Sequence, residues 1–114
     1  MLKVGIVGIG GRMGHALWDC CLGLDGAKVV CGIDKSTDSL PSGCNIEVVD
    51  EPSKLSQAPD LFIDFPRPEC SLSVLEYAKE HQCKVVLGTT GFDYEQKDKI
   101  KEYSKKIAIV FAAN

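Results

Sequence analysis

Short apolar runs alternate along this chain with segments whose apolar residues recur at helical spacing. The run Leu2–Val7 is rich in β-branched residues, a glycine cluster follows it, and the apolar positions from Met13 to Leu24 then fit one helix face. This order is typical of a strand, a tight turn and a helix, and the chain repeats it. The pattern predicts strands at Leu2–Val7, Ala27–Ile33, Asn45–Val49, Leu61–Phe65, Lys84–Leu87 and Ile107–Phe111.

Start and stop signals predict where the helices lie between these strands. Proline and acidic side chains are favoured in the first turn of a helix, a capping box marks the start of a helix, and glycine often follows its last residue. The signals predict a helix from Met13 that stops at the glycines between residues 23 and 26, and a short helix within Glu51–Gln57 that begins with Pro52. A third helix is predicted at Glu69–Gln82, preceded by Pro68. A fourth is predicted from the capping box Asp93 and Gln96 to about Lys105.

Strands that are apolar throughout and alternate with helices indicate a parallel sheet covered on both faces. We therefore expect an α/β fold, a doubly wound parallel sheet of the Rossmann type with three layers and about six strands. With 114 residues, one domain spans 1–114. Ligands bind such sheets beyond the carboxyl ends of the strands, so the informative residues follow positions 7, 33, 64, 87 and 111.

The first of these positions opens a glycine-rich turn. Gly8, Gly11 and Gly14 fit a G-x-x-G-x-x-G spacing, whereas Met13 stands where the stricter G-x-G-x-x-G pattern needs glycine. Such a turn lets the backbone approach a pyrophosphate at the positive end of a helix. The alternative is a turn that only joins a strand to a helix.

Asp34 follows the second strand, twenty residues after Gly14, where a dinucleotide site places an acid for the adenosine ribose hydroxyls. A carboxylate there favours NADH, because it repels the 2′-phosphate of NADPH. Lys35 could neutralise that phosphate, so use of both cofactors is compatible with the sequence. The alternatives are an ordinary turn residue at 34 and a solvated loop charge at 35.

Composition and charge exclude several other functions. Thirteen basic and sixteen acidic residues give a net charge of −3 without a basic cluster, so nucleic acid is not an expected partner. The apolar runs are too short to cross a membrane. The six cysteines form no C-x-x-C pair and are interpreted as reduced thiols of a cytoplasmic protein. His15 and His81 lack ligands at metal spacing and are interpreted as structural, and no metal site is expected.

Four segments together resemble one family. They read VGIGGRMG at 7–14, DFPRPE at 64–69, GTTGF at 88–92 and IVFAAN at 109–114. The chain resembles the N-terminal nucleotide-binding domain of the 4-hydroxy-tetrahydrodipicolinate (dihydrodipicolinate) reductases, NAD(P)H-dependent oxidoreductases of lysine and diaminopimelate biosynthesis. The resemblance runs from residue 1 to residue 114.

The resemblance implies roles for the residues at the strand ends. The turn 8–13 would hold the pyrophosphate, with a contribution from Arg12, and Asp34 and Lys35 would face the adenosine ribose. The segments at 88–90 and 112–114 would line the nicotinamide, and Phe65 and Arg67 would border it. Taken without the resemblance, Phe65 also fits a core aromatic, and Thr89 and Thr90 fit an ordinary turn. The implied cofactor site comprises Gly8, Ile9, Gly10, Gly11, Arg12, Met13, Asp34, Lys35, Phe65, Arg67, Gly88, Thr89, Thr90, Ala112, Ala113 and Asn114.

In this family the chain continues into a domain that binds the cyclic dicarboxylate substrate, supplies the proton and builds a homotetramer. We therefore expect no catalytic residue in these 114 residues, which would be a piece of a longer protein that binds cofactor without turning over alone. Two other functions stay open: a stand-alone NAD(H)-sensing module, and the cofactor domain of a related amino-acid dehydrogenase.

Overall fold

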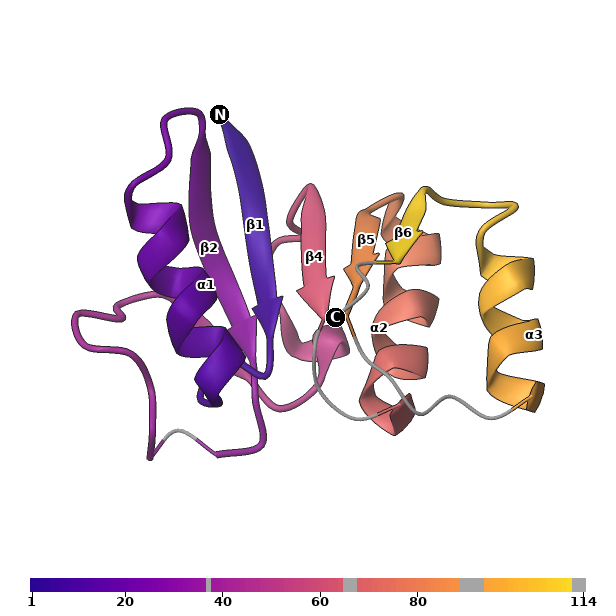
Figure 1. Cartoon of the computed structure of the whole chain (residues 1–114), viewed down its shortest axis with the longest axis horizontal. Coiled ribbons are helices and arrows are strands. Elements are labelled where there is room, and N and C mark those ends of the chain that lie inside the picture. Colours follow the sequence, from indigo (N-terminus) through magenta and orange to yellow (C-terminus); the bar gives the residue numbers. More distant parts are fainter. Residues whose placement is uncertain (37, 65–67, 89–93, 112–114) are drawn as a thin grey trace.

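Six parallel strands form one sheet in the order β3-β2-β1-β4-β5-β6 (Figure 1). The computed structural model describes residues 1–36, 38–64, 68–88 and 94–111. The strand order reverses between β1 and β4, which is the switch point of the Rossmann arrangement. The strands are β1 (Leu2–Val7), β2 (Ala27–Ile33), β3 (Glu47–Val49), β4 (Leu61–Asp64), β5 (Lys84–Leu87) and β6 (Ile109–Phe111).

Helices connect the strands and cover the two faces of the sheet. They are α1 (Arg12–Leu22), the 3-10 turn η1 (Pro52–Lys54), α2 (Pro68–His81) and α3 (Tyr94–Tyr103). Successive side chains of β1 alternate between two cores: Val4 and Ile6 pack with Trp18 of α1, whereas Val7 belongs to the cluster of α2 and α3. The three layers predicted from the alternating pattern are confirmed.

The bounds of β1, β2 and β5 agree with the sequence prediction, and three elements are shorter than predicted. The edge strand β3 begins at Glu47 because it pairs only with β2, from Cys31 onward. In β6, Ile107 is buried ahead of the strand, so its apolar character reflects packing and not strand pairing. The predicted helix at 51–57 is reduced to η1. Asp93 of the predicted capping box lies outside the described residues.

Three of the described cysteines, Cys21, Cys31 and Cys83, are buried as small core residues. Cys31 is 2% and Cys83 is 1% exposed. Burial raises the pKa of the Cys31 thiol to about 12 and that of Cys83 to about 11, so both stay protonated at neutral pH. Among the cysteines whose side chains the structure describes, none forms a disulfide. In the same part of the chain, no helix has the length and apolar character needed to cross a bilayer.

Candidate cofactor-binding site

The residues that follow the strands lie along one side of the sheet, the edge at which the carboxyl ends of the parallel strands meet. Ile33, Val7, Asp64 and Leu87 stand in register across β2, β1, β4 and β5. Asp34, Gly8 and Gly88 come next in the chain, so they share this edge. Three positions that the sequence predicts to be functional are therefore brought together by the parallel register.

The turn after β1 is tight and requires glycine at its first position. Gly8 has a φ of +78°, in the left-handed region that side chains disfavour. Its N–H donates to the Ile33 carbonyl at 2.7 Å, and the Gly11 N–H donates back to the Gly8 carbonyl at 3.0 Å. These bonds fold the chain over the end of β2 and direct it into α1.

Gly14 lets α1 pack directly on this turn. A Cβ atom at position 14 would lie 2.4 Å from the Gly8 carbonyl oxygen and 2.5 Å from the Ile9 carbonyl oxygen. Both contacts are with backbone, which cannot move aside as a side chain can. Position 14 therefore excludes every side chain, which is the packing role of the last glycine in a dinucleotide-binding turn.

The N-terminus of α1 is open to an anion. The N-cap is the exposed Gly11, and the first turn contains no acidic side chain. The amides of the first helical turn lack acceptors within the helix and carry the positive end of its dipole. Arg12 and Met13 are also exposed here. This end of α1 has the properties that bind a diphosphate.

Asp34 is fixed against the glycine turn by backbone amides. Its Oδ2 accepts the Gly10 N–H at 2.8 Å and its Oδ1 accepts the Ser36 N–H at 3.1 Å, while its own N–H donates to the Val49 carbonyl. A carboxylate has about four lone-pair sites, so these two bonds leave acceptor capacity for ribose hydroxyls. A Cβ atom at position 10 would lie 2.9 Å from Oδ2, so glycine there permits this approach.

Lys35 is exposed in the loop after Asp34. Its charge acts on Asp50 at the end of β3: the pKa of Asp50 is lowered first by the hydrogen bond from Lys54, whose Nζ lies 2.7 Å from Oδ1, and last by Lys35. Lys35 thus supplies a cation next to Asp34 in the chain, and Asp50 is an acidic residue close enough to interact with that cation.

The opposite half of the predicted site is described only in part. Gly88 is buried, and its N–H donates to the Asp64 carbonyl at 2.8 Å. Asp64 itself is fully buried at the end of β4, and the sequence interpretation gave it no role. The other residues implied for the nicotinamide end lie outside the described residues: Phe65, Arg67, Thr89, Thr90, Ala112, Ala113 and Asn114.

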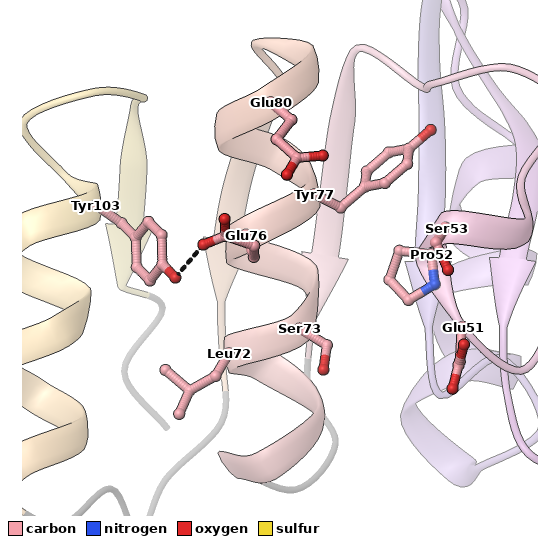
Figure 2. Close-up of a pocket in the computed structure, with 9 residues that line it drawn as sticks. All are labelled: Glu51, Pro52, Ser53, Leu72, Ser73, Glu76, Tyr77, Glu80 and Tyr103. Carbon is pink, nitrogen blue, oxygen red and sulfur yellow. Dashed lines mark hydrogen bonds between the residues drawn. The ribbon is translucent and has the colours of Figure 1, made fainter.

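A shallow groove of about 520 Å³ lies elsewhere, along α2 between η1 and α3 (Figure 2). Glu51, Glu76 and Glu80 give it a negative charge, and it contains none of the predicted cofactor residues. The groove would repel the diphosphate of a dinucleotide, so size alone does not make it the cofactor site. In the described part of the chain, no group of three or more His, Cys, Asp or Glu residues could hold a metal ion.

Replacing Tyr103 in this groove with phenylalanine is expected to reduce stability slightly at neutral pH. The Tyr103 hydroxyl donates to Glu76 Oε2 at 2.5 Å, which raises the pKa of Tyr103 to about 12 and lowers that of Glu76 (Figure 2). Because a lowered carboxyl pKa stabilises the fold only while the group is ionised, the difference between wild type and variant should disappear as pH falls through the Glu76 pKa. Urea unfolding at several pH values measures it, and a difference that grows in acid would contradict the assignment.

The strand order, the glycine turn and the carboxylate at the end of β2 define a Rossmann-type domain, the class of α/β domain in which dinucleotides bind at this edge of the sheet. Residues 2–114 match the family model described as dihydrodipicolinate reductase, N-terminus. The chain belongs to this family.

Curated relatives carry a matching name. The 4-hydroxy-tetrahydrodipicolinate reductases of Bordetella pertussis and Bordetella parapertussis are each 36% identical to this chain over 121 aligned residues. Each alignment covers 98% of this chain and 45% of the relative. The chain therefore spans somewhat less than half the length of these relatives.

Solved structures show the same fold at lower identity. A dipicolinate-bound dihydrodipicolinate reductase from a Paenisporosarcina species has a TM-score of 0.84 at 22% identity, covering 98% of this chain and 47% of its own. A myo-inositol 2-dehydrogenase from Lactobacillus plantarum has a TM-score of 0.77 at 17% identity, covering 97% and 36%. These likenesses confirm the Rossmann-type architecture.

Proposed function

We propose that this chain binds NADH or NADPH and forms the cofactor half of an enzyme that reduces 4-hydroxy-tetrahydrodipicolinate to tetrahydrodipicolinate. The observation that carries the proposal is the Asp34 carboxylate, held 2.8 Å from the Gly10 amide beside the open N-terminus of α1. This pairs an acceptor for ribose hydroxyls with donors for a diphosphate. Membership of the reductase family and the names of the Bordetella relatives support the substrate.

The residues of the chain would bind and orient the cofactor. The amides at the start of α1 would hold the diphosphate, with the Arg12 side chain beside them, and Asp34 would accept the ribose hydroxyls. Gly88 lies at the same sheet edge, where it would approach the nicotinamide together with the neighbouring residues of the implied site. The cofactor, when bound, supplies the hydride.

The whole enzyme would require more chain than these 114 residues. The relatives are about twice as long, and the resemblance assigns the binding of the cyclic dicarboxylate, the proton donor and the homotetramer to the part beyond this domain. We place the reaction in the cytoplasm, because the described cysteines are free thiols and the family is biosynthetic.

Calorimetric titration tests this proposal. We expect the 114-residue chain to bind NADH, and NADPH to a lesser extent, because Asp34 repels a 2′-phosphate while Lys35 offsets part of that repulsion. The same chain, mixed with NADH and 4-hydroxy-tetrahydrodipicolinate, should oxidise no cofactor. Folded protein that binds neither cofactor, or that reduces the substrate by itself, would contradict the proposal.

A further inference from the structure

We propose that His15 is a positioning residue for the adenosine end of the cofactor and that it supports binding of a 2′-phosphate more than binding of the free ribose hydroxyls. This inference rests on the proposed function. From the sequence alone, His15 is interpreted as structural because it lies on a predicted helix, away from any strand end. The structure places it beside the loop that follows Asp34.

His15 joins the two parts of the candidate site. It lies in the first turns of α1, and its backbone N–H donates to the Gly11 carbonyl at 3.0 Å. Its ring Nε2 hydrogen-bonds the carbonyl oxygen of Ser39, twenty-four residues further along the chain. Because a carbonyl only accepts, Nε2 must carry a hydrogen and donate it. The helix that would bind the diphosphate is thus tied directly to the loop that would meet the ribose.

The loop after Asp34 is exposed at its start and packed further on. Lys35, Ser36, Asp38 and Ser39 are exposed. Local bonds hold two of them: Asp34 Oδ1 accepts the Ser36 N–H, and Ser36 Oγ accepts the Asp38 N–H at 3.3 Å. Beyond this point, apolar residues of the segment pack into the core around Trp18 of α1. They are Leu40, Cys44 and Ile46. The contact from His15 fixes the exposed part of the loop just before this packed part.

The two nucleotides depend on this loop to different extents. Ribose hydroxyls need Asp34, which β2, β3 and the Gly10 amide hold without help from His15. A 2′-phosphate is repelled by Asp34 and needs the cation of Lys35 and the polar groups beside it, which the exposed loop carries. Freeing the loop from α1 therefore costs affinity for NADPH more than for NADH.

The test compares His15→Ala with Asp19→Ala, an exposed position one turn later on α1, by calorimetric titration with NADH and with NADPH. We expect His15→Ala to weaken NADPH binding by roughly fivefold or more, the size of one lost hydrogen bond, and to leave NADH binding within about twofold. Asp19→Ala should change neither. His15→Gln should restore NADPH binding, because the glutamine amide can also donate to the Ser39 carbonyl.

Trp18 provides a second readout that needs no cofactor. It is the one tryptophan in the sequence, is 5% exposed, and packs beneath the same loop. Its emission should shift to longer wavelength in His15→Ala and remain as in the wild type in His15→Gln, with circular dichroism confirming that the variants fold.

Three results would overturn the assignment of His15: equal weakening of the two cofactors, unchanged NADPH binding, or an unchanged Trp18 emission in His15→Ala. A wild-type chain that binds neither cofactor would instead refute the proposed function, and this inference with it. If His15→Ala does not fold, His15→Gln and a His15→Asn variant decide the question. The asparagine side chain is too short to reach Ser39 and should bind NADPH as weakly as a chain without the contact.

Discussion

Replacing Gly14 with alanine is expected to lower the free energy of unfolding by about 3 kcal/mol, the upper part of the range for overpacked positions. The added Cβ atom would lie 2.4 and 2.5 Å from two backbone oxygens of the turn, so α1 must move away from β1 to admit it. For a domain of this size the fall in Tm is roughly 10 °C or more. Urea unfolding followed by Trp18 emission and by circular dichroism measures the change.

Gly11→Ala is the matched control for this substitution. A Cβ atom at position 11 would lie 3.4 Å from the Gly8 oxygen, an ordinary contact, and the φ of Gly11 is −87°, which any residue adopts. Its stability should stay within about 1 kcal/mol of the wild type, since alanine is only a poorer N-cap than glycine. Equal stability of the two variants would show that α1 can shift on the turn at no cost.

Replacing Asp34 with alanine is expected to weaken NADH binding by roughly 10- to 100-fold, because hydrogen bonds to a charged carboxylate are worth more than neutral ones. The substitution removes the proposed acceptor for the ribose hydroxyls and also leaves the Gly10 and Ser36 amides without their partner. Calorimetric titration with NADH gives the affinity, and urea unfolding separates the loss of binding from the loss of stability.

Two further variants help to interpret the NADH affinity of Asp34→Ala: the first is a control, and the second separates the charge of Asp34 from its role as a hydrogen-bond acceptor. Asp25→Ala removes an exposed acid from the turn before β2, at the opposite edge of the sheet, and should bind NADH as the wild type does. Asp34→Asn keeps an oxygen that can accept the Gly10 N–H but removes the charge, so its affinity for NADPH should rise relative to NADH. Unchanged NADH affinity in Asp34→Ala would place the ribose elsewhere.

Most of the fold could be predicted from the sequence, because burial on both faces leaves a clear pattern. The strands Leu2–Val7 and Ala27–Ile33 are central and apolar throughout, and their bounds agree with the structure. The pattern misled at Ile107, whose side chain is buried before β6 begins. Burial and strand pairing coincide in the middle of a sheet but separate at its edges, where β3 and β6 lie.

The sequence predicts which residues of the candidate site lie together, but it does not predict the hydrogen bonds between them. Because parallel strands end at one edge, the sequence sufficed to expect Gly8, Asp34 and Gly88 together. The bonds from Gly10 to Asp34 and from His15 to Ser39 each span twenty-four residues and depend on the exact backbone path of two turns. No spacing rule indicates them. The nicotinamide end of the site stays a prediction, since most of its residues lie outside the described part of the chain.

The bond between Gly10 and Asp34 also constrains how cofactor preference can change by mutation. Under the proposed function, the Asp34 side chain would discriminate between the two nucleotides, and it is at the same time the acceptor that holds the glycine turn onto β2. A lineage or a designer that exchanges Asp34 for a small neutral residue to admit a 2′-phosphate also releases the turn. Substitutions that keep an oxygen acceptor at this position, asparagine first among them, therefore open the shortest route from one nucleotide to the other.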